Sequence, residues 1–343
     1  MEPLLGKNID ELQIIAQSVG LPKYAGKQLG QWLYVHRVTS VDEMTDISLQ
    51  GRERLKARYW IGRHEPMQVA VSIDGTKKYL FQIKTGETST GYIESVFIPE
   101  EERATLCVST QIGCKMGCKF CMTGTLGFHG QLPASEILNQ IFTINSLEGD
   151  SISNVVYMGE GEPMDNIDEV LRSLHVLTSS YGCAWSPKRI TVSSAGLIPG
   201  LKRYLEESEC HLAISLHNPF AAERQNIMPV EKLYPIHQVI NLIKQYDFSH
   251  QRRISFEYIC WGGINDNLKY ANALCRILKG IECRINLIRF HAGVSHEFPA
   301  SNEKEMERFR DYLSAHGLIT TIRKSRGEDI LAACGMLAAK QEQ

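Results

Sequence analysis

The chain has 343 residues and a formal net charge of −2, with 43% hydrophobic and 22% charged residues. This length and composition fit one large and one small domain of an ordinary globular protein. No apolar run approaches the roughly 18–20 residues that span a bilayer, and residues 1–16 lack the pattern of a signal peptide. Ten cysteines without an export signal indicate thiol or metal chemistry in a reducing cytoplasm rather than a disulfide framework. With a net charge near zero, any nucleic-acid surface has to be a local patch.

Residues 1–64 are predicted to be helical. Leu12, Ile15 and Val19 recur at the spacing of one helix face, and a second helix is predicted over 25–35. This region is expected to form a small helical domain that precedes the main one.

The stretch 52–64 combines basic and aromatic side chains. It holds five Lys or Arg residues against one acid, with Tyr59 and Trp60 among them. Basic groups with interleaved aromatics suit phosphate contact and stacking on bases. The alternative is a solvated helix face with its two aromatics in the core.

From residue 68 to residue 98 the pattern becomes strand-like. Strands are predicted over 78–83 and 92–98, separated by the turn-prone segment 84–87. They are expected to form a small sheet or hairpin that leads into the core. Glu94 is the only acid in the second strand and is predicted to face outward.

The rest of the chain alternates between strand and helix patterns. Strands are predicted at 154–158, 189–193, 211–215, 253–259, 284–290 and 319–324, and helices at 134–147, 168–180, 197–207, 235–246, 267–279 and 303–316. Six such repeats predict an α/β fold of parallel β/α units with right-handed crossovers, curled into a partial (β/α)6 barrel. Active groups are then expected at the carboxyl ends of the strands.

Three cysteines precede these repeats. Cys114, Cys118 and Cys121 have the spacing CxxxCxxC, with Phe120 just before the last. Thiolates are soft ligands for iron–sulfur clusters and zinc, and an all-protein cluster site normally uses four of them. A [4Fe–4S] cluster held by three thiolates leaves one iron open to a small molecule. The alternative is a structural zinc loop whose fourth ligand lies elsewhere.

Polar groups follow successive predicted strands. The first strand runs into Gly-Glu-Gly-Glu-Pro-Met at 159–164, where Glu162 can accept the ammonium group of a bound amino acid. Ser193, His217 and His291 end later strands in the same way. Each of them alone also fits a structural role. Together they indicate a site, because a core does not require them.

Two further cysteines stand outside the loop. Cys107 lies in the strand-like run 105–110, and Cys334 lies among small residues in 326–335. A lone cysteine beside alanines is ordinarily a small buried hydrophobe. That interpretation is given to the remaining cysteines, which are Cys183, Cys210, Cys260, Cys275 and Cys283.

Taken together, these segments resemble the radical S-adenosylmethionine (SAM) RNA methyltransferase family of RlmN and Cfr. The resemblance covers nearly the whole chain and is greatest to the RlmN branch, which methylates C2 of adenosine in 23S rRNA and tRNA. It rests on 21–24, 103–107, the three-cysteine loop, the Gly-Glu-Pro turn, 215–217 and 326–335. The expected organisation is a helical RNA-binding domain over 1–66, a β linker over 67–99, and a radical SAM core with a methyl-carrier segment over 100–343.

The resemblance implies a role for each site residue. It implies that Cys114, Cys118 and Cys121 hold a [4Fe–4S] cluster, that Cys334 carries the methyl group, and that Cys107 is its disulfide partner. Glu94 falls on the position of a proton acceptor. The implied SAM-binding residues are Gly161, Glu162, Ser193, Ser215, Leu216, His217 and His291. His291 stands where many members have Asn, so its shape differs from theirs.

The resemblance also implies the chemistry. Two SAM molecules are used per turnover, one to methylate Cys334 and one to generate the radical that activates that methyl group. The methyl carbon first forms a covalent protein–RNA adduct, and formation of a Cys107–Cys334 disulfide then releases the product. A flavodoxin- or ferredoxin-type reductant, a monomeric state and a cytoplasmic location are expected. Candidate RNA-backbone contacts are 52–64, Arg323, Lys324 and Arg326.

Three alternatives stay open at this point. Cfr-like methylation at adenine C8 shares every motif. A non-catalytic RNA-binding protein would use the three cysteines for structural zinc. A radical SAM enzyme for a small molecule would need no RNA, but Cys107 and Cys334 argue against it.

Overall fold

The structure is a computed structural model that describes residues 1–84, 89–248, 253–291 and 298–337. Within these residues, a ten-stranded sheet has the order β14-β13-β12-β11-β10-β9-β6-β5-β4-β3. Two short pairs, β1–β2 and β7–β8, lie outside it. The described part of the chain has no helix long and apolar enough to cross a bilayer.

The strands are β1 (Glu2–Pro3), β2 (Tyr59–Trp60), β3 (Gln68–Val71), β4 (Lys77–Lys84), β5 (Thr90–Pro99), β6 (Ala104–Cys107), β7 (Gln111–Gly113), β8 (Phe128–Gln131), β9 (Asn154–Tyr157), β10 (Ile190–Ser194), β11 (His211–Ser215), β12 (Ile254–Cys260), β13 (Cys283–Arg289) and β14 (Ile319–Ile322). The α-helices are α1 (Ile9–Ser18), α2 (Ala25–Gly30), α3 (Leu49–Lys56), α4 (Met122–Thr125), α5 (Ala134–Leu147), α6 (Ile167–Thr178), α7 (Ile198–Glu207), α8 (Ala221–Ile227), α9 (Ile236–Ile243), α10 (Leu268–Ile277) and α11 (Glu303–Ala315). A π-helix covers Gln31–His36, and 3-10 turns cover Val41–Glu43, Pro163–Asn166, Pro187–Arg189, Pro229–Lys232 and Glu328–Ile330.

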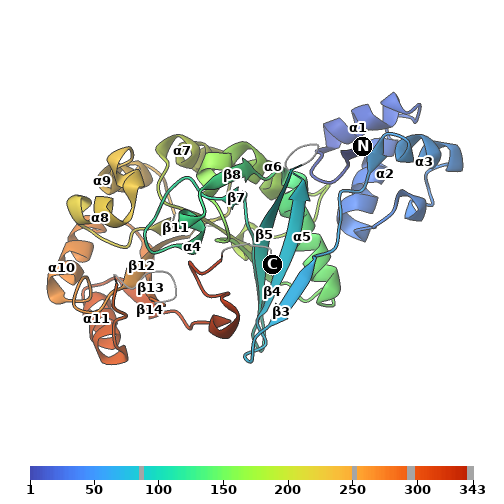
Figure 1. The fold of residues 1–343 in the computed structure, drawn as a ribbon. Helices are drawn as coiled ribbons and strands as arrows, with labels where there is room; N and C mark the ends of the chain where they lie inside the picture. The colour runs from blue at the N-terminus through green and yellow to red at the C-terminus, as the bar shows by residue number, and fades with distance from the viewer. Residues whose placement is uncertain (85–88, 249–252, 292–297, 338–343) are drawn as a thin grey trace.

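The predicted partial barrel is confirmed. Strands β6 and β9 to β14 pair in parallel, and helices α5, α6, α7, α9, α10 and α11 lie between them in the chain. Figure 1 shows these helices along the outside of the curved sheet. The six predicted strands match the observed ones to within two residues at each end. Helix α8 was not predicted.

The strands predicted over 78–83 and 92–98 are confirmed as β4 and β5, and they lead into the core as expected. Strand β5 pairs antiparallel with both β4 and β6, so the β3–β5 extension continues the barrel sheet across β6. The reason is that the first strand of a partial barrel has an open edge, which another strand can cover. Residues 85–87 of the predicted turn lie outside the described residues. The strand predicted over 105–110 ends at Cys107.

Strand register determines which side chains share a face. Cys107 lies opposite Val96 on β5 and opposite Val156 on β9. Because partners in register point to the same side and side chains alternate along a strand, Glu94 belongs to this face as well. The same rule places Ser193, Ser215, Glu257 and Asn286 on it. The opposite, helix-covered face carries buried apolar residues such as Leu106, Val155, Val192 and Ile214.

The N-terminal region is helical except at its ends. Helix α1 begins with a capping box between Asn8 and Glu11, and α2 continues into the π-helix. Contrary to the all-helical prediction, β1 and β2 pair in parallel, Glu2 with Tyr59 and Pro3 with Trp60.

The basic stretch 52–64 makes internal contacts. Arg52 Nη1 donates to the Asp42 carbonyl at 2.6 Å, and Lys56 pairs with Asp42 at 2.7 Å. Tyr59 is buried. These contacts favour the structural interpretation of the stretch, because its cations already have protein partners.

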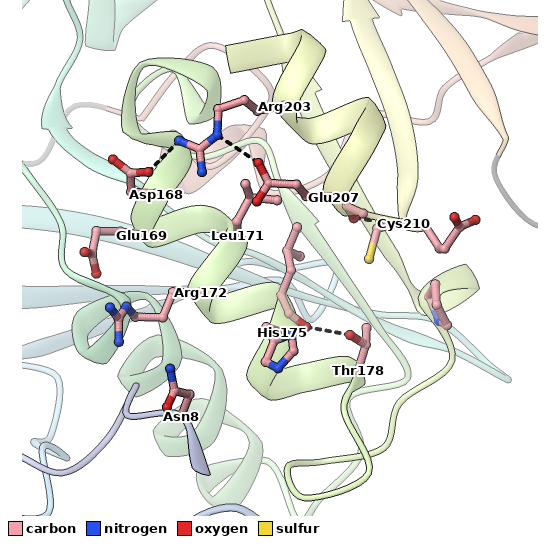
Figure 2. Close-up of a pocket in the computed structure, with 14 residues that line it drawn as sticks. Asn8, Asp168, Glu169, Leu171, Arg172, His175, Thr178, Arg203, Glu207 and Cys210 are labelled. Carbon is pink, nitrogen blue, oxygen red and sulfur yellow. Dashed lines mark hydrogen bonds and ion pairs between the residues drawn. The ribbon is translucent and has the colours of Figure 1, made fainter. Parts of the chain in front are cut away.

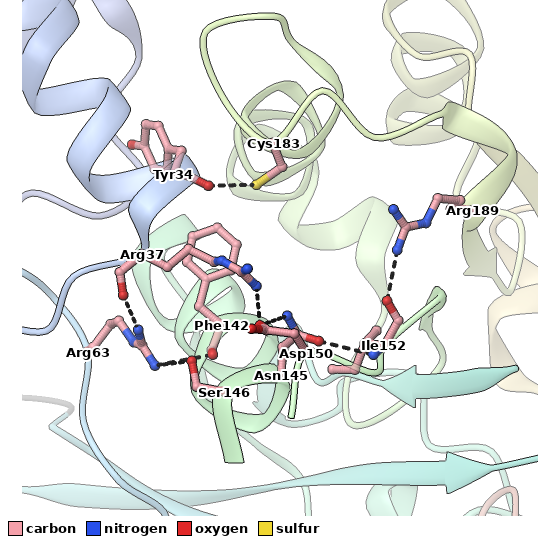
Figure 3. Close-up of polar contacts among 10 residues, drawn as sticks. All are labelled: Tyr34, Arg37, Arg63, Phe142, Asn145, Ser146, Asp150, Ile152, Cys183 and Arg189. Carbon is pink, nitrogen blue, oxygen red and sulfur yellow. Dashed lines mark hydrogen bonds and ion pairs between the residues drawn. The ribbon is translucent and has the colours of Figure 1, made fainter. Parts of the chain in front are cut away.

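Arg63 joins the N-terminal region to helix α5, as Figure 3 shows. Its guanidinium donates to the carbonyls of Arg37 at 2.5 Å and Phe142 at 3.2 Å, and to Ser146 Oγ at 3.1 Å. Arg37 in turn pairs with Asp150 at 2.6 Å. A single half-buried side chain thus satisfies carbonyl groups from both regions.

Replacing Arg63 with Met is expected to lower the free energy of unfolding by about 2 kcal/mol, because the carbonyl groups that it bonds lose their donor. Urea denaturation followed by circular dichroism measures the change. Arg58→Met is the matched control. Its exposed side chain makes one hydrogen bond, to the Ser18 carbonyl at 3.2 Å, and a change within about 0.5 kcal/mol is expected. Equal losses in both variants would contradict the joining role of Arg63.

Candidate active site

The three-cysteine loop connects β7 to α4. Cys114 N donates to the Gly127 carbonyl at 2.8 Å, which ties the loop to the start of β8. Gly113 before it has φ +71°, and a Cβ there would lie 1.9 Å from the Gly127 oxygen. The loop therefore requires glycine at this position. All three thiols are half-buried.

The donor set suits a cluster. Burial raises the pKa of the Cys114 thiol to about 12 and raises those of Cys118 and Cys121. Such thiols lose their protons only when a strong positive charge, such as a bound metal, is present. Soft thiolates are the usual ligands of iron–sulfur clusters.

Arg224 is a site residue that sequence reasoning missed. It is fully buried on α8 and pairs with Glu231. Its guanidinium also donates to the carbonyls of Ala195 and Ser215 at 2.9 Å and of Leu216 at 3.0 Å. Arg224 therefore holds together the ends of β10 and β11, and its charge acts against the rise in the pKa of Cys118. The seven-residue spacing to a glutamate was the only sequence signal.

The Gly-Glu-Pro turn lies at the end of β9. Gly161 has φ +99°, and a Cβ there would lie 2.5 Å from Gln111 Cβ. Glu162 is buried and accepts hydrogen bonds from Met164 N at 3.0 Å and Ala195 N at 2.8 Å. Burial raises the pKa of this carboxyl group to about 7 despite these bonds. A cationic ligand at this position would favour its ionised form.

His217 is a neutral, fixed imidazole. Its Nδ1 accepts a hydrogen bond from Ile259 N at 3.1 Å, so the ring proton resides on Nε2. Burial lowers the pKa of His217 to about 3. The ring packs edge-on against Phe120 at 4.8 Å between centroids. This contact places the end of β11 beside the cysteine loop, and the half-buried Ser193 and Ser215 lie on the same face of the sheet.

Cys107 and Cys334 line one cavity of about 260 Å³. Both are free thiols in the structure; Cys334 is exposed and Cys107 is half-buried. Burial raises the pKa of Cys107 to about 12, the nearby Cys334 adds to that rise, and Arg323 opposes it. The cationic side chains around the cavity are Arg103, Arg289, Arg323, Lys324 and Arg326.

His291 also lines this cavity rather than the turn at Glu162. Its ring contacts Ser325 Oγ at 2.6 Å and Glu328 at 3.4 Å. The ring therefore helps to hold the segment that leads to Cys334.

The prediction that Glu94 faces outward is wrong. Glu94 is buried, and it lies two residues from Val96, which lines the cavity with Cys107. Its backbone is fixed because Glu94 N donates to Glu160 at 3.0 Å and the Glu94 carbonyl accepts from Ser109 Oγ at 2.6 Å. The C-terminal segment, far away in the sequence, covers this face, and a strand pattern alone does not reveal such a cover.

The segment that carries Cys334 is held at two points. At one, Gly327 N donates to Asp74 at 3.1 Å, and Asp329 accepts from Ser72 Oγ at 2.5 Å. At the other, Met122 N donates to the Gly335 carbonyl at 2.8 Å. Figure 1 shows this segment in red between the β12–β14 end of the sheet and the β3–β5 extension. The residues that follow Cys121 and Cys334 in the chain are thus hydrogen-bonded to each other.

The other cysteines are only partly as predicted. Cys210, Cys260 and Cys283 are buried, whereas Cys183 and Cys275 are half-buried. A larger cavity of about 710 Å³ lies beside Cys210 and is lined by residues of α6 and α7. Figure 2 shows the residues that line it. Among its charged groups, Arg203 pairs with Asp168 at 2.5 Å and with Glu207 at 2.9 Å. It contains none of the predicted site residues.

These features define a class of protein. A partial β/α barrel with a three-thiol loop at the carboxyl ends of its strands, and a glycine-rich acidic turn beside it, is the architecture of a radical SAM enzyme.

Comparison with known proteins agrees and is more specific. Residues 3–61 match the family model of the ribosomal RNA large subunit methyltransferase N-terminal domain. A probable dual-specificity RNA methyltransferase RlmN from Bacteroides fragilis is 55% identical over 99% of this chain and 98% of its own. The dual-specificity RNA methyltransferase RlmN of Syntrophus aciditrophicus is 38% identical over 97% and 95%. The crystal structure of a radical SAM methyltransferase from Sphaerobacter thermophilus superposes with a TM-score of 0.91 at 34% identity, covering 99% of this chain and 100% of that one. The chain belongs to the RlmN family of radical SAM RNA methyltransferases, whose cofactors are SAM and an iron–sulfur cluster.

The raised pKa of Glu162 predicts a pH-dependent stability of the cluster-free protein. The carboxyl group has a pKa of about 7 in the folded state against an ordinary value of 4.5. Protonated Glu162 therefore adds about 3 kcal/mol to the free energy of unfolding below pH 4.5, and this stabilisation is lost as the pH rises through 7. Glu162→Gln is expected to flatten this part of the curve of unfolding free energy against pH. Glu307→Gln, at an exposed position, should leave the curve unchanged; an unchanged curve for Glu162→Gln would refute the assignment.

Proposed function

We propose that this protein methylates C2 of an adenosine in 23S rRNA and in tRNA, with Cys334 as the methyl carrier. The observation that supports this most directly is the hydrogen bond of 2.8 Å between Met122 N and the Gly335 carbonyl. It connects the residue after the last loop cysteine to the residue after Cys334. The carrier sulfur therefore belongs to the same site as the three thiols.

Cys114, Cys118 and Cys121 are the proposed ligands of a [4Fe–4S] cluster. The cluster, when bound, supplies the electron that cleaves SAM. The residues proposed to bind SAM are Gly161, Glu162, Ser193, Ser215, Leu216, His217 and His291. Glu162 suits the SAM ammonium, and the neutral His217 can donate a hydrogen bond from Nε2 without adding charge.

Glu94 and Cys107 on one face of the sheet, together with Cys334 of the segment that covers this face, perform the transfer. Cys334 accepts a methyl group from one SAM, and after loss of one hydrogen to the radical derived from a second SAM this carbon bonds to C2 of the adenine. Glu94 takes the C2 proton, and the unpaired electron of the adduct passes to a one-electron acceptor, for which the oxidised cluster left by SAM cleavage would serve. Cys107 then attacks the Cys334 sulfur, so an S–S bond replaces the S–C bond. The released carbon keeps the electron pair, gains a proton and becomes the methyl group.

The cations around the cavity suit an RNA backbone. Arg323 pairs with Glu257 at 3.5 Å and Arg326 with Asp74 at 3.9 Å. Lys324 is exposed and has no ion-pair partner among the described residues. An unstacked adenosine in a loop reaches such a cavity at lower cost than a paired one. The proposal includes the helical region 1–66 as a second RNA contact, a flavodoxin- or ferredoxin-type electron donor, and a monomer.

The test is mass spectrometry of nucleosides from rRNA and tRNA incubated with anaerobically reconstituted protein, SAM and a reductant. The expected product is 2-methyladenosine, in line with relatives named RlmN at up to 55% identity. If 8-methyladenosine appeared instead, the Cfr-like alternative would replace the proposal. If SAM were cleaved without any methylated adenosine, the substrate would be a small molecule.

Cys334→Ala is expected to retain the cluster and SAM binding and to form no methylated adenosine, because the carrier sulfur is missing. Iron content, SAM binding and nucleoside mass spectrometry measure these properties separately. Cys275→Ala, at a half-buried cysteine on α10, is the control and should retain activity. Methylated product from Cys334→Ala would eliminate the carrier role.

Lys324→Ala is expected to weaken RNA binding several-fold and to reduce the slope of log affinity against log salt by about 1, because one phosphate contact is lost. A filter-binding titration over a salt series measures both. Lys304→Ala, at an exposed lysine on α11 outside the cavity, should change neither. An unchanged slope for Lys324→Ala would place the RNA backbone elsewhere.

A further inference from the structure

We propose that Lys78 is a positioning residue that orients Glu94 for removal of the C2 proton. This inference rests on the proposed function, because it assigns a partner to the proton acceptor of that reaction. The resemblance assigned no role to Lys78.

The two side chains form a close, shielded ion pair. Lys78 Nζ lies 2.8 Å from Glu94 Oε1, with 17% of the lysine side chain and 7% of the glutamate side chain exposed. They come from neighbouring strands. Lys78 on β4 is opposite Val96, and Glu94 on β5 is opposite Leu80, so the pair is diagonal on one face of the sheet.

This face is the one with the reacting thiols. Val96 is in register with Lys78 on one side and with Cys107 on the other. Val96 also packs against Ala332 of the C-terminal segment, two residues before Cys334. The Lys78–Glu94 pair is therefore about two strand residues from the cavity, roughly 7 Å along β5.

The residue before Lys78 on β4, Lys77, provides an example of a purely structural ion pair. Lys77 points to the opposite face and contacts Glu148 at 2.8 Å, with Tyr79 bonding the same carboxylate. That contact attaches β4 to the residue after α5 on the helix-covered side. Lys78 makes no comparable connection between layers, since its partner is on the adjacent strand.

A nearly buried ion pair contributes little to the free energy of unfolding, so its presence points to a functional role for the charges. Removing two charges from water costs several kcal/mol each, and apolar residues of similar volume are often at least as stable. A carboxylate has two oxygen atoms, and the Lys78 ammonium group lies against one of them, Glu94 Oε1. The ammonium group also fixes the direction of the carboxylate, which proton transfer requires.

The test separates two half-reactions in the reconstituted full-length enzyme. Lys78→Met should methylate Cys334 at the wild-type level, as measured by peptide mass spectrometry. Formation of 2-methyladenosine should fall by about 10- to 100-fold, as expected for a base that is present but misplaced. The covalent protein–RNA adduct should accumulate and be visible on a denaturing gel. Lys78→Arg, which keeps a cation, should restore most of the product.

Lys77→Met is the matched control, because it removes the neighbouring lysine and its ion pair from the other face. It should lower thermal stability without adduct accumulation. The double variant Lys78→Met/Glu94→Gln leaves no unpaired charge and should resemble Glu94→Gln alone, because both changes act through one carboxylate. If Lys78→Met does not fold, this double variant and Lys78→Arg still provide the comparison.

Two results would overturn the positioning role while leaving the proposed function intact. One is wild-type product formation by Lys78→Met. The other is a loss of Cys334 methylation that equals the loss of product, which is what a general structural defect gives. A wild-type enzyme that forms no 2-methyladenosine, or a Glu94→Gln variant that turns over normally, would overturn the proposed role of Glu94 and this inference with it.

Discussion

The pairing of β5 with β6 is the constraint on which the site depends. It attaches an antiparallel extension to the open edge of a parallel barrel in one register, Val96 opposite Cys107. Since side chains alternate along a strand, a shift of one residue would move Glu94 to the helix-covered face. The same pairing brings a carboxylate and a thiol from separate strands to one face beside the cavity. The extension is thus part of the site and not only a linker.

The C-terminal segment completes the arrangement by covering that face. It has little regular structure of its own, so its position depends on hydrogen bonds at its two ends, one to the Asp74 side chain and the other between backbone groups. Asp74 accepts hydrogen bonds from Gly327 N and Thr76 N, and these bonds hold the pKa of its carboxyl group at about 2. At the other end the segment bonds the three-cysteine loop through Gly335. Cys334, the proposed methyl carrier, therefore lies between two points at which its segment is attached.

The sequence predicted the strands of the barrel and of the extension well, but it did not predict the burial of the face that holds Glu94, for physical reasons. Strands buried under helices give continuous apolar runs, and helices give a 3.6-residue period, so both can be recognised locally. The face that holds Glu94 is covered by residues more than 200 positions away in the sequence. The local hydrophobic periodicity carries no information about such a distant cover. Charged residues such as Lys78 and Arg224 are ordinarily assigned to solvent, and their burial follows from partners that only the fold brings near. The strand-end motifs were informative because parallel β/α units bring the carboxyl ends of all their strands to one edge of the sheet, so chain order alone groups these residues.

The charges around the site show how one face can serve thiol and proton chemistry together. Cys107 has a pKa raised to about 12 by burial, so as a nucleophile it needs a cation nearby when it reacts. Arg323 lines the same cavity, and the Glu257 carboxylate raises the pKa of this guanidinium and keeps it charged. Lys78 lies beside Glu94, the proposed proton acceptor, on the same face of the sheet. Arg323, which follows β14, acts on both Cys107 and Cys334, whereas Lys78 on β4 pairs with Glu94. In the proposed reaction, a substitution of Lys78 should therefore affect the step that uses Glu94 and leave the thiol steps running.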